Sequence, residues 1–188
     1  MKLKIYIIED KISRASEIKE LLQKAYKNNE WKKHFRGIYI EDDAIEIIKG
    51  SEPDIENNRL YYKKHEILDT VNHIIKYRES DDTIGISLDI KLTKEENKSP
   101  ENQTLTCETA REVYLLRENG VHICPMTCLE QFDERSQEFI GESIGKNFMN
   151  VLALVEENSE SALFSLAYFF VHGEMPTEEL VNQVFGFD

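Results

Sequence analysis

The chain has 188 residues, a length sufficient for one domain with a full hydrophobic core. Of these residues, 40% are hydrophobic and 31% are charged, as is usual for a globular protein. Its formal net charge of −13 argues against nucleic-acid binding, because a phosphate backbone requires a basic surface. No apolar run approaches the roughly 20 residues that span a bilayer, so we expect no membrane partner. The three cysteines, Cys107, Cys124 and Cys128, form no CxxC pair, which predicts reduced thiols and a cytoplasmic protein.

The chain opens with a pattern typical of a β–α unit. Residues 3–8 are a nearly continuous apolar run, as in a parallel strand buried on both faces. Residues 13–27 then carry apolar side chains three and four positions apart, which predicts an amphipathic helix. A second strand is expected at residues 37–40 and a short helix at residues 44–49. The polar residues 50–58 predict a loop.

The middle of the chain continues the alternation. A longer helix is predicted over residues 61–77 and a third buried strand over residues 83–88. Residues 94–104 are rich in Lys, Glu, Asn, Ser and Gln, which favours an exposed loop. A helix returns at residues 107–118, where an Asn-Gly pair provides a stop signal.

Two more strand predictions complete the fold. The fourth strand is expected at residues 121–126, followed by a short helix at residues 129–138. A weaker fifth strand at residues 140–145 precedes a helix at residues 147–157. Strand and helix therefore alternate about five times, which predicts a doubly wound α/β fold with a five-stranded parallel sheet over residues 1–158.

Residues 159–188 are predicted to form a helical extension. Residues 162–172 are apolar nearly all round, as expected of a buried helix. A second helix is predicted after Gly173, opened by Pro176 and Thr177. The extension is expected to pack on the domain or to contact a partner, for example as a homodimer interface.

Residues with metal or phosphate chemistry follow four of the five predicted strands. In chain order, these residues are the pair Glu9 and Asp10, then Asp89, Thr127 and Lys146. Because ligands bind at the carboxyl ends of parallel strands, and the connections are right-handed, we expect these residues to meet at one edge of the sheet.

The side chains have complementary chemistry. Three carboxylates, from Glu9, Asp10 and Asp89, form a hard oxygen site suited to Mg²⁺. Asp89 could attack phosphorus as a nucleophile and form an acyl phosphate. Lys146 and Thr127 would offer an ammonium and a hydroxyl to the phosphoryl oxygens.

Four segments resemble the motifs of phosphoacceptor receiver domains, the flavodoxin-like domains of response regulators in two-component signalling. They are IYIIED at residues 5–10, ISLDIKL at 86–92, CPMT at 124–127 and GKNF at 145–148. The resemblance extends over residues 2–158, and the loops diverge.

The resemblance implies a role for each matching residue. The implied Mg²⁺ ligands are the carboxylates of Glu9, Asp10 and Asp89 and the backbone carbonyl of Lys91. Asp89 would accept a phosphoryl group from a histidine kinase or a phosphotransfer protein, and Thr127 and Lys146 would respond to it. Such a protein signals to a downstream protein, here unknown, by protein–protein contact. It is not an enzyme beyond its own phosphotransfer and autodephosphorylation.

Two other functions are open. Ser143 stands where the family usually has an aromatic residue, and Asn147 where it commonly has proline, which suggests a pseudo-receiver that serves as a static interaction scaffold. Phosphatases of the haloacid dehalogenase type also use Asp, then Thr or Ser, then Lys in chain order. They have a second Asp where this chain has Lys91, so we consider this activity the weaker alternative.

Overall fold

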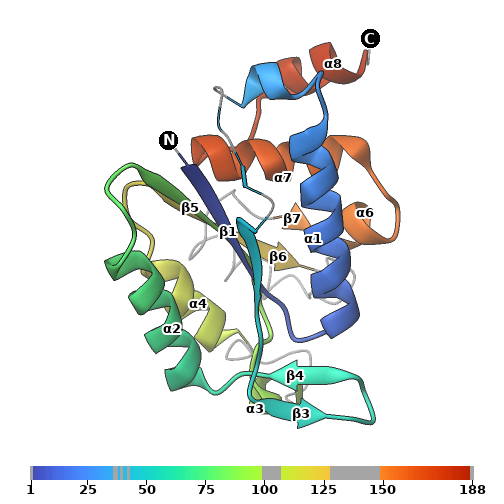
Figure 1. Cartoon of the computed structure of the whole chain (residues 1–188). Helices are drawn as coiled ribbons and strands as arrows, with labels where there is room; N and C mark the ends of the chain where they lie inside the picture. The colour runs from blue at the N-terminus through green and yellow to red at the C-terminus, as the bar shows by residue number, and fades with distance from the viewer. Residues whose placement is uncertain are drawn as a thin grey trace.

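The computed structural model describes residues 2–35, 38, 40–41, 43–98, 107–127 and 149–186, with the backbone alone for Lys98 and Thr127. A parallel sheet of five strands lies at the centre (Figure 1). In spatial order the strands are β2 (Ile45–Ile48), β1 (Lys2–Ile8), β5 (Asp82–Asp89), β6 (Val121–Thr127) and β7 (Met149–Asn150).

The sheet confirms the predicted doubly wound α/β fold. Neighbouring strands run parallel, with Ile8 beside Leu88 and Asp89 beside Met126. Numbered along the chain within this sheet, the strand order is 2-1-3-4-5, which is compatible with a flavodoxin-like fold. The order reverses between β1 and β5, and ligands of open α/β sheets bind at such a reversal.

Helices cover both faces of the sheet (Figure 1). One face carries α1 (Ile12–Lys27), α6 (Val151–Val155) and α7 (Glu160–His172), and the other carries α2 (Lys64–Lys76) and α4 (Glu108–Leu115). Successive side chains of β5 point to opposite faces of the sheet. Ile84, Ile86 and Leu88 point toward α2 and α4, and the residues between them point to the other face. The remaining helices are α3 (Lys94–Lys98), α8 (Glu178–Phe185) and a 3₁₀ turn, η1 (Lys32–His34).

Helix α7 is part of the core of the described structure. Ser159 caps its amino end, and Gly173, with φ of 78°, ends it in the left-handed conformation. Phe164 and Phe170 are fully buried. Gly85 of β5 allows the close approach, because a Cβ atom there would lie 2.8 Å from Cδ1 of Phe170. The predicted apolar helix thus lies directly on the sheet.

A β-hairpin is inserted between β2 and α2. Its strands, β3 (Glu52–Asp54) and β4 (Arg59–Tyr61), pair antiparallel at the carboxyl end of β1 (Figure 1). Its turn is held by two bonds from Asn57 to the Asp54 carboxylate and by the left-handed Asn58, with φ of 52°. A Cβ atom at Gly50 would lie 2.3 Å from the carbonyl oxygens of Leu60 and Tyr61, so only glycine fits there.

Two local predictions in this region are wrong. Residues 44–49, predicted as a helix, contain strand β2 (Ile45–Ile48), because three isoleucines in four positions favour a strand beside β1. Residues 50–58, predicted as a loop, contain β3 and the turn of the hairpin. The strand expected at residues 37–40 falls partly outside the described residues.

The fifth strand is also placed differently. The described fifth strand is β7, at Met149–Asn150, which pairs with the end of β6. The strand predicted at residues 140–145 and the helix predicted at 129–138 lie outside the described residues. The helix expected from residue 147 begins later, as α6, because the Asn150 side chain caps it by accepting from the Leu152 amide.

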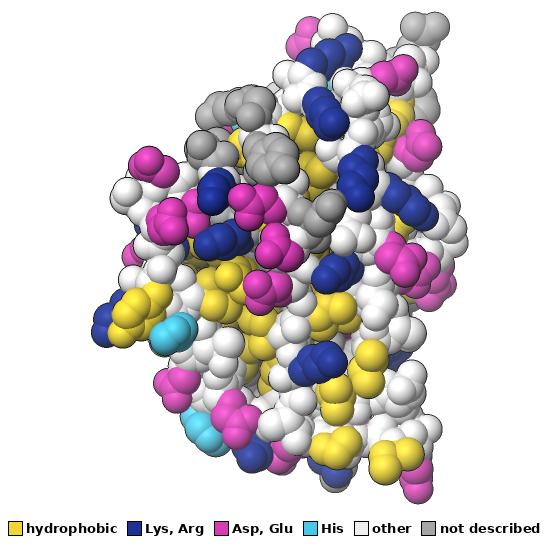
Figure 2. All heavy atoms as spheres, viewed as in Figure 1, with side chains coloured by type: hydrophobic (Ala, Val, Ile, Leu, Met, Phe, Trp, Pro, Cys, Tyr) yellow, Lys and Arg dark blue, Asp and Glu magenta, His cyan; other side chains and the backbone are white. Residues whose placement is uncertain are grey.

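Acidic and basic side chains are interspersed over the face shown in Figure 2. Among the described residues, no helix combines the length and the apolar composition that crossing a membrane requires.

Replacing Gly85 with alanine should lower the free energy of unfolding by about 1–3 kcal/mol, because the added methyl group overpacks the contact with Phe170. Urea denaturation measures this change. Ser87→Ala is the matched control, since Ser87 is buried two positions further along β5 and its hydroxyl has no hydrogen-bond partner within the described structure. Equal stability of Gly85→Ala and the parent chain would contradict the described contact of α7 with β5.

Candidate metal and phosphoacceptor site

Three carboxylates meet at the carboxyl ends of β1 and β5. Glu9 and Asp10 directly follow β1, and Asp89 ends β5, which pairs with β1 in register. One carboxylate oxygen from each of the three residues lies within 4.8 Å of the other two. The exposed fraction is 4% for Glu9 and 1% for Asp10, while Asp89 is half-buried. The structure thus brings together the three acidic side chains that the sequence proposed as metal ligands.

The cluster is electrostatically unfavourable by itself. Burial, followed by the charge of Asp89, raises the pKa of Glu9 well above its usual range. Burial, followed by the charge of Asp10, raises the pKa of Asp89 from 3.8 to about 7. Arg14 opposes both shifts without cancelling them. Hard oxygen ligands that repel one another are the donor set that binds Mg²⁺, so these residues fit such an ion.

The loop after β1 is held by backbone and side-chain contacts. The Lys11 amide donates to Oε1 of Glu9 at 3.1 Å, and Nη1 of Arg14 lies 3.8 Å from the same oxygen. The buried hydroxyl of Tyr62 accepts from the Glu9 amide at 3.2 Å and donates to the Ile48 carbonyl. The orientation of Glu9 is therefore set by the start of α1 and by the chain after the hairpin.

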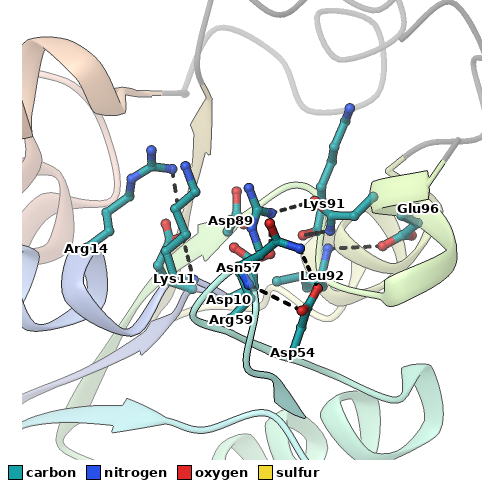
Figure 3. Close-up of polar contacts among 12 residues, drawn as sticks. Asp10, Lys11, Arg14, Asp54, Asn57, Arg59, Asp89, Lys91, Leu92 and Glu96 are labelled. Carbon is teal, nitrogen blue, oxygen red and sulfur yellow. Dashed lines mark hydrogen bonds and ion pairs between the residues drawn. The ribbon is translucent and has the colours of Figure 1, made fainter. Parts of the chain in front are cut away.

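The hairpin brings an arginine into the site. Nη1 of Arg59 lies 2.6 Å from Oδ2 of Asp10 and 2.6 Å from Oδ1 of Asn97, and the close-up in Figure 3 shows Arg59 beside Asp10 and Asp89. The backbone of the hairpin also contacts Asp10, because the Leu60 amide donates to the Asp10 carbonyl at 2.8 Å. Sequence reasoning missed Arg59. The one available signal was the Asn57-Asn58 turn pair before a short β-favouring run.

The backbone carbonyl of Lys91, the fourth proposed ligand, is already engaged. It accepts from Nδ2 of Asn97 at 2.9 Å, and the same amide donates to the Thr93 carbonyl at 3.1 Å. Asn97 therefore joins the loop after Asp89 to the arginine on the hairpin.

A buried glutamate fixes the rest of the loop after Asp89. Glu96 accepts from the Leu92 amide at 3.1 Å and from the Thr93 amide at 3.0 Å, while Thr93 Oγ1 accepts from the Glu96 amide, which is a capping box at α3. Its other oxygen accepts from the Thr109 amide in the first turn of α4, at 2.8 Å. The loop is thus tied to α4 as well as to α3.

Two proposed site residues, Thr127 and Lys146, have side chains outside the described part of the structure. Thr127 is the last residue of β6, which pairs with β5, so its backbone lies at the same edge of the sheet as Asp89. Its side chain is outside the described part of the structure. Lys146, together with Ser143 and Asn147, lies outside the described residues, and the described fifth strand begins after Lys146.

Comparison with known proteins gives no match: no family model matches the chain, and no curated protein or solved structure is significantly similar to it.

Asp89→Asn should stabilise the metal-free protein at pH 8 and leave its stability almost unchanged at pH 4. A pKa of about 7 in place of 3.8 means that folding is penalised as pH rises from about 4 through 7, and the penalty is complete above that range. The shift corresponds to about 4 kcal/mol, which solvent at the half-buried carboxylate reduces to about 2 kcal/mol. Urea denaturation in EDTA at the two pH values measures this difference.

Asp82→Asn is the control for that comparison. Asp82 begins the same strand, is buried, and pairs with Lys4 at 3.2 Å, so its replacement should destabilise the protein at both pH values. A destabilised Asp89→Asn variant at pH 8 would show that the acidic cluster is not repulsive in the folded state.

Proposed function

We propose that this protein is a phosphoacceptor receiver of the two-component type, which takes a phosphoryl group on Asp89 with Mg²⁺ and signals by protein–protein contact. The observation that carries the proposal is the convergence of Glu9, Asp10 and Asp89 within 4.8 Å at the edge where the strand order reverses. A structural ion pair or a helix cap would not require three mutually repelling carboxylates at that edge.

In the proposed reaction, the donor is the phosphohistidine of a kinase or phosphotransfer protein. A carboxylate oxygen of Asp89 attacks phosphorus, so that an O–P bond forms while the N–P bond breaks. The imidazole nitrogen keeps the bonding electron pair and leaves as a neutral ring, because its other nitrogen carries a proton. The product is an acyl phosphate on Asp89, which water later hydrolyses.

The chain's own residues orient the nucleophile. The Ile90 amide donates to Oδ1 of Asp89 at 2.8 Å, which leaves Oδ2 as the attacking atom. Glu9, Asp10 and Asp89 would hold Mg²⁺, with the Lys91 carbonyl as a fourth ligand. When bound, the ion supplies positive charge between these carboxylates and the phosphoryl oxygens. Thr127 and Lys146 remain the proposed hydroxyl and ammonium partners of the phosphoryl group.

The output is proposed to be a contact with a downstream protein or a homodimer contact through the C-terminal helices. Helix α8 offers such a surface, since Leu180, Val184 and Phe185 are only partly buried against the core. In this proposal the protein acts as a regulator rather than as an enzyme on external substrates.

A static interaction scaffold is the second candidate. It is favoured by the Arg59–Asp10 ion pair and by the Asn97 bond to the Lys91 carbonyl, because the chain's own groups bond to two of the proposed metal ligands. In this case Asp89 would be a structural residue of the same fold.

Phosphorylation with a small-molecule donor separates the two candidates. Incubation with phosphoramidate or acetyl phosphate and Mg²⁺ should add the mass of one phosphoryl group, detected by intact mass spectrometry. Asp89→Asn should abolish the addition, whereas folded Asp82→Asn, at the other end of β5, should retain it. An unmodified parent chain that also fails to bind beryllofluoride would leave the scaffold as the function.

A further inference from the structure

We propose that Arg59 is an internal cation that competes with the divalent metal ion for Asp10, so that Arg59 sets the affinity of the site for the metal. This inference rests on the proposed function, because it concerns the same acidic site. It identifies a residue that tunes metal binding and that the four receiver-like segments do not contain.

The ion pair occupies the most buried carboxylate of the cluster. Asp10 is 1% exposed, and its Oδ2 atom lies 2.6 Å from Nη1 of Arg59. A charge-assisted bond of this length is strong, because the surrounding side chains exclude water. An ion that coordinates Asp10 must share the charge of this carboxylate with the guanidinium, so the two cations compete for it.

The hairpin holds Arg59 at this position. The Leu60 amide donates to the Asp10 carbonyl at 2.8 Å, and the Tyr62 amide donates to the Leu92 carbonyl at 2.9 Å. Strand β4 and the residue that follows it therefore bridge the loop after β1 and the loop after β5, which carry the proposed ligands. The absence of a side chain at Gly50 allows the chain to fold back against β4. Arg59 is thus a fixed neighbour of Asp10 rather than a mobile surface residue.

Asn97 extends the competition to a second ligand. Its Oδ1 accepts from Nη1 of Arg59 at 2.6 Å, while its Nδ2 donates to the Lys91 carbonyl at 2.9 Å. We call Arg59 and Asn97 the clasp. The clasp occupies two of the four proposed metal ligands, Asp10 and the Lys91 carbonyl, and its two residues bond to each other. Removing either residue should therefore weaken the other's contact and favour the metal.

The clasp predicts a specific order of Mg²⁺ affinities. Binding to a site that is competent in only a fraction of molecules is weakened by that fraction, so loss of the clasp should tighten binding. Isothermal titration of the full chain with MgCl₂ should give a dissociation constant about tenfold lower for Arg59→Ala, equivalent to about 1.4 kcal/mol. Asn97→Ala should also tighten binding, although it changes no charge.

Two variants separate competition from a general charge effect. Arg14→Ala removes the same charge beside Glu9, at 3.8 Å, but breaks no contact with Asp10, so its gain in affinity should be smaller than that of Arg59→Ala. Arg59→Lys keeps the charge and loses the planar fork, so its affinity should lie between those of the parent and Arg59→Ala. In the parent chain, Mg²⁺ should also shift the NMR signals of the Arg59 side chain and the Leu60 amide.

Several outcomes would overturn the inference. Equal Mg²⁺ affinities of Arg59→Ala and Arg14→Ala would show a general charge effect in place of competition, and weaker binding by Arg59→Ala would show that Arg59 holds Asp10 in place for the metal. Should Arg59→Ala lose its circular dichroism signal, Arg59→Lys and Asn97→Ala decide, and unchanged affinities in both refute the clasp. No Mg²⁺ binding by any variant refutes it together with the metal site. Tighter binding without phosphorylation of Asp89 leaves the clasp standing and refutes only the phosphoacceptor function.

Discussion

The repulsion among Glu9, Asp10 and Asp89 is the constraint on which the rest of the site depends. The pairing of β1 with β5 fixes the carboxylates within 4.8 Å of each other, and burial removes the water that would screen them. The free energy of this arrangement is unfavourable unless positive charge approaches. Proteins retain such clusters at sites where the charge performs a function, and the surrounding structure offsets the cost.

The sheet and the loops fix different parts of the site. The sheet sets the backbone positions of the three acidic residues, because the register of β1 and β5 fixes which residues lie side by side at their ends. The loops are fixed by groups from elsewhere in the chain: Tyr62 holds the loop after β1, and Glu96 holds the loop after β5 against α4. Both supporting groups are buried, so solvent does not compete for these two contacts.

The parts of the fold that sequence predicted are those with a strong local signal. Strands β1 and β5 are continuous apolar runs that stop at acidic residues, and helix α7 is apolar nearly all round. The run at residues 44–49 is short, and its periodicity suits a helix or a strand equally, so its isoleucines and its pairing with β1 decide it. Arg59 and Asp10 are 49 positions apart, and no local pattern records that contact. Residues 94–104 were predicted as an exposed loop, but residues 94–98 form α3, which begins at a capping box of Thr93 and the buried Glu96. No local pattern records the bond of Glu96 to Thr109.

The two proposed functions, phosphoacceptor and scaffold, require different partners for Asp10. With Arg59 in place, the cluster has part of the positive charge it requires, and the hairpin closes over the loop after β1. In the proposed metal-bound form, a divalent ion would compete with Arg59 for the charge of Asp10, while the backbone bond from the Leu60 amide to the Asp10 carbonyl would still hold β4 at the site. In this proposal, metal binding and the Arg59–Asp10 contact would be linked reciprocally, so a change that weakens the contact would favour the metal.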